Sequence, residues 1–144
     1  MIPKYRAWIK SEKRMVATDN LLCIDYENEE IVTQEIYFES GLPSERDIDN
    51  YDFDDINLMQ STGLKDKNGK EIFEGDIVTD GDVTSDIKYH QTLGFYMIGK
   101  YGFSVPFGQG VDVEYFEEFA DHVSKTFEVA GNVYENPELL EVTE

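Results

Sequence analysis

The chain has 144 residues, of which 40% are hydrophobic and 13% aromatic. It is therefore long and apolar enough to fold around a core without disulfides or metals. It carries 31 acidic and 12 basic residues, a formal charge of −19, and a surface of this sign repels the phosphates of nucleic acids. The composition excludes direct DNA or RNA binding and favours solubility, cations or basic partners.

The sequence predicts a protein of the cytoplasm. No stretch reaches the ~20 apolar residues that a membrane-spanning helix needs, and residues 1–14 lack the apolar centre of a secretory signal. The single cysteine, Cys23, excludes an intramolecular disulfide, as is usual in a reducing compartment. Because Cys23 lies in an apolar run at 21–24, we expect a buried, inert thiol.

The first half of the chain is predicted to be strands and loops. Alternating residues over 5–10 predict a strand, 11–14 a turn and 15–17 a returning strand. Short strands are expected at 21–26 and 31–38, with a turn at 28–30. Residues 40–55 predict a long loop because Ser40, Gly41, Pro43 and Ser44 interrupt any regular pattern. A short strand follows at 56–59.

The predicted loop is rich in aspartate, and we interpret it as a partner-binding acidic loop. Carboxylates also suit a hard cation such as Ca²⁺, but this spacing lacks the central glycine and distal glutamate of an EF-hand loop. A solvated loop without a metal is therefore the favoured interpretation. The acids are Asp47, Asp49, Asp52, Asp54 and Asp55.

Residues 63–78 contain the most distinctive turn signals. Asn68 and Gly69 predict a tight turn because both tolerate positive φ, and Gly75 predicts a bend before a β-branched pair. Such an entry into a strand is common in small SH3-like barrels, a comparison at the level of fold alone. The start of the turn at Asp66 resembles an EF-hand loop, but Lys70 stands at the fifth position, which favours a hairpin turn.

The second half is expected to be glycine-punctuated β structure with one helix. Strands are predicted at 86–90, 93–98, 101–107 and 126–134, and a short helical turn at 137–140. The helix covers 112–123, with Asp112 as its cap. Its apolar stripe has helical spacing and consists of Phe116, Phe119, Ala120 and Val123. We therefore predict a single domain over residues 1–144. Its fold class is mainly β (α+β), with a small SH3-like barrel element, additional strands and one packed helix.

No catalytic constellation is visible. His90 and His122 are far apart in sequence, and a zinc site would need both, or one with Cys23 and carboxylates. Ser104 does not stand in the G-x-S-x-G motif. The chain has so many carboxylates that a glycosidase-like pair is always possible, but the sequence does not identify one. We expect no cofactor, no metal and no catalytic residue.

An aromatic stretch is the last candidate binding surface. It lacks the interleaved Lys or Arg that single-stranded nucleic acids require, so packing in the core is the expected role. The stretch consists of Phe95, Tyr96, Tyr101, Phe103 and Phe107.

Three blocks together resemble the YopX family of small proteins of phages and prophages of Gram-positive bacteria. They read MIPKYRAW at 1–8, GLKDKNGKEIFEGDIV at 63–78 and GNVYENPELL at 131–140, so the resemblance spans the chain. It implies a phage or prophage origin and a β-rich fold, but no activity and no site residue. From the residues themselves, Trp8 is expected to anchor the core and Asn132 to bond nearby backbone groups.

Charge is also distributed unevenly along the chain. Residues 1–14 carry five bases and one acid, whereas residues 111–144 carry ten acids and one base. This asymmetry would draw the two ends of one chain, or two copies, together, although each surface pair contributes only about 0–1 kcal/mol.

Three functions are consistent with these observations. The first is a non-enzymatic module for protein–protein contact that binds itself, as a homo-oligomer, or a basic host or phage protein. The alternative is an acidic inhibitor that mimics DNA and occupies a host DNA-binding protein. The third is a carboxylate-based hydrolase.

Overall fold

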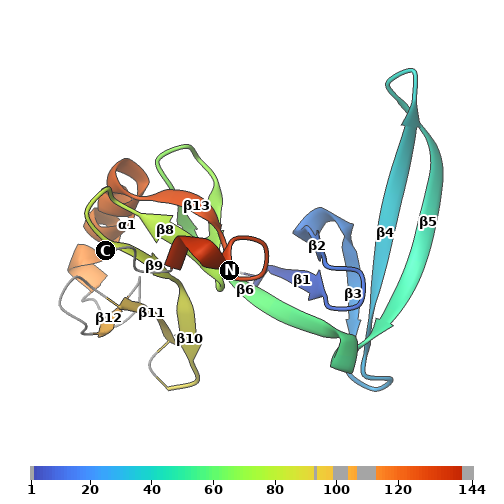
Figure 1. Ribbon diagram of the computed structural model, residues 1–144, viewed down its shortest axis with the longest axis horizontal. Helices are drawn as coiled ribbons and strands as arrows, with labels where there is room; N and C mark the ends of the chain where they lie inside the picture. The colour runs from blue at the N-terminus through green and yellow to red at the C-terminus, as the bar shows by residue number, and fades with distance from the viewer. Residues whose placement is uncertain (1, 93, 99–103, 107–112, 141–144) are drawn as a thin grey trace. The chain divides into compact units, whose positions relative to one another are not determined.

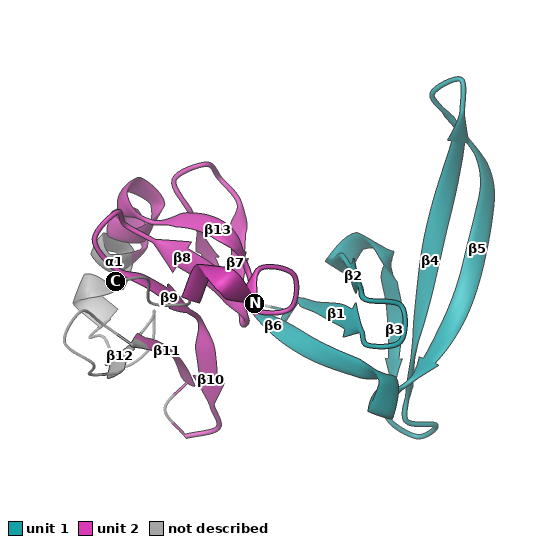
Figure 2. Ribbon diagram, in the orientation of Figure 1, with its two compact units in different colours: residues 1–60 teal, residues 61–144 magenta. Residues whose placement is uncertain are grey.

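The computed structural model describes residues 2–92, 94–98, 104–106 and 113–140 (Figure 1). The chain divides into two compact units, residues 1–60 and 61–144 (Figure 2), and the boundary falls within strand β6 (Ile56–Lys65). Each unit is described by itself. The single domain expected over the whole chain stays a prediction.

The first unit begins with the predicted hairpin. Strand β1 (Tyr5–Ile9) pairs antiparallel with β2 (Arg14–Val16) on one side and with β6 on the other. Residues 6–9 of this unit are buried on both faces of β1. Its core consists of Ala7, Ile9, Val16, Ile31 and Ile56.

A second sheet completes this unit. A 3-10 turn (Thr18–Asn20) leads into β3 (Leu21–Asp25), which is followed by β4 (Glu30–Glu39) and β5 (Leu42–Asp52) in the order β3-β4-β5. Another 3-10 turn, Phe53–Asp55, precedes β6. Strand β3 pairs with β4 only as far as Thr33. Beyond that point, residues 34–48 form a two-stranded ribbon, which we call the arm.

The prediction of a long loop at 40–55 is wrong, because most of this segment is strand β5. Ser40 and Gly41 have φ values of 55° and 81°, which is the backbone of a two-residue hairpin turn. Pro43 fits because β5 is an edge strand, where a missing N–H disrupts no further ladder, and the register shifts near it, between Tyr37 and Phe38. The residues that we interpreted as breakers therefore form a turn and one end of a strand.

The second unit is built from short strands and one helix. After the end of β6 come β7 (Glu71–Phe73), β8 (Asp76–Thr79), β9 (Thr84–Asp86) and β10 (Lys88–His90). They are followed by β11 (Gly94–Ile98), β12 (Ser104–Pro106), α1 (Val113–Thr126), β13 (Glu128–Asn132) and a 3-10 turn (Pro137–Leu140). The sheets run β13-β8-β9 and β10-β11-β12.

The core of the second unit brings the helix against these strands. Val123 is fully buried, and Ala120 packs against the same cluster, so the described part of the predicted stripe faces the core. The remainder of that stripe and its cap, Asp112, lie outside the residues whose side chains are described. The mainly β, α+β fold with a curled, barrel-like sheet and one packed helix is confirmed. No helix in the described ranges is both long and apolar enough to cross a membrane.

Candidate functional site

The five aspartates of the predicted acidic loop lie in three different places. Asp47 and Asp49 alternate along β5, so they share one face of the hairpin. Asp52 is an odd number of positions away and lies on the opposite face. Asp54 and Asp55 belong to the 3-10 turn that follows. The structure therefore brings Asp47 and Asp49 onto one surface and separates the others from it.

The arm has one acidic face. Glu35 lies opposite Asp47, and Tyr37 lies opposite Glu45, in the ladder between β4 and β5. A hydrogen bond to Asp47, burial and the negative charges of Asp47 and Glu35 raise the pKa of Tyr37 to about 12. Like charges directly opposite one another in a sheet repel. A positively charged partner would relieve this repulsion.

Asp55 has a structural role instead. Its carboxylate accepts hydrogen bonds from the backbone N–H and the Oγ of Ser11, at 3.0 and 2.5 Å, and so holds the β1–β2 turn against the segment before β6. A polar hollow of about 240 Å³ lies nearby. Its lining residues are Asn28, Glu29, Asp52, Phe53 and Asp54. Within the described ranges, no three His, Cys, Asp or Glu residues are placed to hold a metal ion.

The arm also exposes large apolar side chains. Phe38 is 65% and Leu42 70% exposed, and the two flank the hairpin turn, one on each face of the ribbon. Ile48 and Tyr37 are exposed as well, at 48% and 41%. Grouped apolar side chains on the surface of a protein commonly mark a contact with another molecule.

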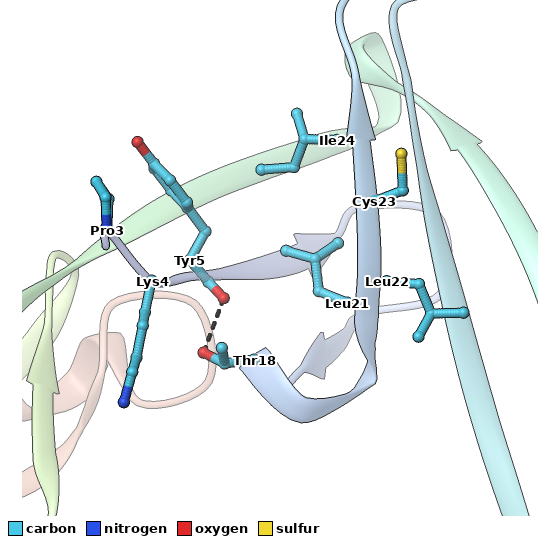
Figure 3. Close-up of a pocket in the computed structure, with 8 residues that line it drawn as sticks. All are labelled: Pro3, Lys4, Tyr5, Thr18, Leu21, Leu22, Cys23 and Ile24. Carbon is cyan, nitrogen blue, oxygen red and sulfur yellow. Dashed lines mark hydrogen bonds between the residues drawn. The ribbon is translucent and has the colours of Figure 1, made fainter. Parts of the chain in front are cut away.

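A hollow of about 330 Å³ lies at the outer edge of β3 (Figure 3). Thr18 donates a hydrogen bond from Oγ1 to the carbonyl of Tyr5, at 2.8 Å, which fixes the start of β1 beside the turn before β3. Apolar side chains supply most of the lining. The lining residues are Pro3, Lys4, Tyr5, Thr18, Leu21, Leu22, Cys23 and Ile24.

Cys23 contradicts its sequence prediction, because its thiol is exposed and not buried. The ladder between β3 and β4 shifts register between Leu21 and Cys23, and such a bulge interrupts the regular alternation of side chains along a strand, so that Leu22 and Cys23 lie on the same side of β3 (Figure 3). Figure 3 shows Leu21 and Ile24 on the side of β3 toward Tyr5. An apolar run at a sheet edge therefore did not imply a buried thiol.

The blocks that carry the family resemblance have structural roles. Trp8 is buried, with 9% of its surface exposed, which confirms the prediction of a core anchor. Asn132 accepts hydrogen bonds through Oδ1 from the N–H groups of Tyr134 and Glu135, at 3.0 and 2.9 Å. The local turn expected around Asn132 is therefore confirmed.

The Asn68–Gly69 turn depends on a residue that sequence reasoning did not identify as its anchor. Asp66 is 2% exposed, and its Oδ1 accepts hydrogen bonds from the N–H groups of Asn68 and Lys70, at 2.9 and 2.8 Å. Its Oδ2 accepts one from Val129 at 2.9 Å. The spacing Asp-x-Asn-Gly is a signal of such a side-chain-capped turn. The carboxylate of Asp66 therefore binds backbone N–H groups and stabilises the hairpin turn.

The other candidates do not come together. His90 is exposed on β10, and His122 is exposed near the end of α1, where its Nδ1 lies 3.4 Å from Thr126 Oγ1. Ser104 lies on β12. Phe95 is buried in the core, as expected for its aromatic stretch, while Tyr101, Phe103 and Phe107 lie outside the described residues.

Comparison with known proteins gives a family and a structural neighbour. The family model described as YopX protein matches residues 4–141. The crystal structure of protein EF1440 from Enterococcus faecalis is 31% identical, with a TM-score of 0.59, and the match covers 98% of this chain and 99% of that chain. No curated protein matches the chain.

Proposed function

Because the chain belongs to the YopX family, we propose that it is a phage or prophage protein of the host bacterial cytoplasm that acts without catalysis, through protein–protein contact. We propose further that its contact is self-association through the arm. The protein would thus neither bind nucleic acid directly nor enter a membrane.

One observation carries this proposal, namely that the arm holds four of the large hydrophobic side chains exposed in the described chain. They are Tyr37, Phe38, Leu42 and Ile48. The core of the same unit is filled by other residues, so these four are not needed to bury it. Fully burying an exposed Leu, Ile or Phe side chain gains about 1.5–3 kcal/mol, and side chains that are 41–70% exposed have part of that gain available to an association.

The test is sedimentation equilibrium of the purified protein. The unmodified chain is expected to self-associate, and Phe38→Asp together with Leu42→Asp should weaken that association roughly 100-fold or more, from the loss of two buried apolar groups. Leu139→Asp is the matched control, since Leu139 is also an exposed leucine, at 39%, but lies in the other unit. A strict monomer at high concentration would contradict the proposal.

A second function has one observation in its favour. Glu45, Asp47 and Asp49 alternate along β5 and so form a regular row of negative charge on one face, which the interpretation as a loop had not suggested. An acidic inhibitor that mimics DNA would use such a row to bind a basic host protein.

This second function predicts a steep dependence on salt. A tagged pull-down from host lysate should recover a basic, DNA-binding protein at low salt and lose it at about 0.5 M salt, because screening shortens the reach of exposed charges. Asp47→Asn with Asp49→Asn should reduce the recovery several-fold, and Asp121→Asn, an exposed acid of α1, should not. Recovery that is the same at both salt concentrations would exclude the mimic.

A further inference from the structure

We infer that the tip of the arm, residues 38–42, enters the hollow at the edge of β3 on a second copy of the chain. This inference rests on the proposed self-association and names its contact. The tip places Phe38 on one face and Leu42 on the other. Because apolar side chains lie on both faces of the tip, the tip removes the largest apolar area from water when it enters a hollow with apolar walls.

The hollow suits this occupant in its lining and size. It is lined mainly by apolar side chains from β3 and the start of β1, and Leu22 at its edge is 43% exposed. Its volume of about 330 Å³ lies at the lower end of the range of about 300–1,000 Å³ found for ligand pockets. It has room for a few side chains of a hairpin tip, not for a folded element.

The charges of the two surfaces are opposite. Residues 34–48 carry four acids and one base, whereas the residues that line the hollow include a single charged side chain, which is basic. Lys4 lines the hollow itself. Complementary charge of this kind orients an encounter and increases its rate. It also disfavours an arm packed against another arm, since both would be acidic.

The tip cannot reach the hollow of its own chain. Leu21, which lines the hollow, is paired with Thr33 of β4, and β4 continues from there for six residues to Glu39. At about 3.3 Å per residue, the tip lies roughly 20 Å beyond the hollow. Figure 1 shows β4 and β5 continuing past the end of β3. The occupant is therefore the arm of a second copy.

A contact between two different surfaces has consequences for assembly. Because tip and hollow are not the same patch, one contact leaves a free tip on one copy and a free hollow on the other. Two copies exchange arms reciprocally, or further copies add, which gives a ring if the rotation closes and an open filament if it does not. In a reciprocal dimer or a ring, each chain both gives and receives an arm.

The single native cysteine provides the test. Cys23 is exposed and borders the hollow, with its Sγ on the side of β3 away from Tyr5 (Figure 3), and a disulfide requires Cα atoms roughly 4.4–6.8 Å apart. Leu42→Cys and Phe38→Cys are each treated with copper(II)–phenanthroline in air, which takes up the two electrons released when two thiols join. Peptide mass spectrometry then identifies the linkage. Leu139→Cys is the control for collisions between exposed thiols.

The expected product is a dimer-sized species in which the new thiol is joined to Cys23 of another chain, in at least tenfold excess over Leu139→Cys. Lys4→Glu should lower that yield about 3- to 10-fold through reversal of the charge at the hollow.

The outcomes separate the two proposals. If the unmodified chain self-associates but the tip variants crosslink no better than the control, the contact is refuted and self-association stands. If the unmodified chain is a monomer at all concentrations, both are refuted. A linkage to Cys23 within one chain would show that the arm reaches its own hollow, and would also refute the contact between copies.

Discussion

Asp66→Ala is expected to lower the free energy of unfolding by about 3–5 kcal/mol, because it leaves three part-buried backbone N–H groups without their acceptor. Its carboxylate accepts from three N–H groups, two in the turn and one on β13, all within 2.8–2.9 Å. Denaturant titration followed by circular dichroism measures the change. Glu138→Ala, at an exposed acid of the same unit, should stay within about 0.5 kcal/mol of the unmodified chain. A comparable loss in both variants would contradict this role for Asp66.

The same carboxylate predicts part of the response to acid. Burial, the largest single effect, raises the pKa of Asp66, but the N–H groups of Val129, Lys70 and Asn68 and the charge of Lys70 together lower it below 3.8. The folded-state pKa is thus below the unfolded one. The stabilisation is complete above about pH 4 and is lost as the pH falls through the folded-state value. Asp66→Asn should therefore lose less stability than the unmodified chain between about pH 4 and pH 2.

Gly131→Ala is expected to destabilise the fold by about 2–4 kcal/mol, through overpacking against Asn136. A Cβ at this position would lie 2.8 Å from the Cβ of Asn136 and 2.7 Å from its Cγ. The Asn136 side chain has little freedom to move, because its Oδ1 accepts from the N–H of Asn132 at 3.2 Å. Thermal and denaturant unfolding both measure the effect.

Two further variants test the cause of this loss. Gly69→Ala has open space around the new methyl group but a φ of +81°, so only backbone strain of about 1 kcal/mol is expected. Adding Asn136→Gly to Gly131→Ala should restore part of the lost stability, as a double-mutant cycle detects. If the double variant is as unstable as the sum of the two single variants, the clash is not the cause.

The elements that the sequence predicted well are those with local signals. The strand signal at 5–10, the Asn68–Gly69 turn and the C-terminal part of the helix stripe, Ala120 and Val123, each depend on a few neighbouring positions, and the structure confirms all three. The segment 40–55 was missed because its strand character comes from pairing with β4 and not from its own side chains, which are almost all exposed. A strand that buries almost nothing has no hydrophobic periodicity to detect.

The candidate surfaces were harder to predict for a related reason. The acidic face of the arm joins Glu35 to Asp47 across a ladder, and no spacing along the chain encodes that register. The exposure of Cys23 depends on a bulge and on the edge position of β3. Both are properties of the sheet. The sequence showed only that acidic residues are concentrated in this segment.

The arm lacks a third strand over residues 34–48, and two strands alone are only marginally stable in water. Local unfolding of the arm should therefore cost less free energy than unfolding of any other part of the first unit. Contacts with another molecule would keep the arm folded. Between residues 30 and 52 the single basic residue is Arg46, which is exposed on β5. Trypsin has one site there, in the middle of the ribbon. The rate of cleavage at this bond would then fall as the protein concentration rises, so that a protease reports how much of the protein is assembled.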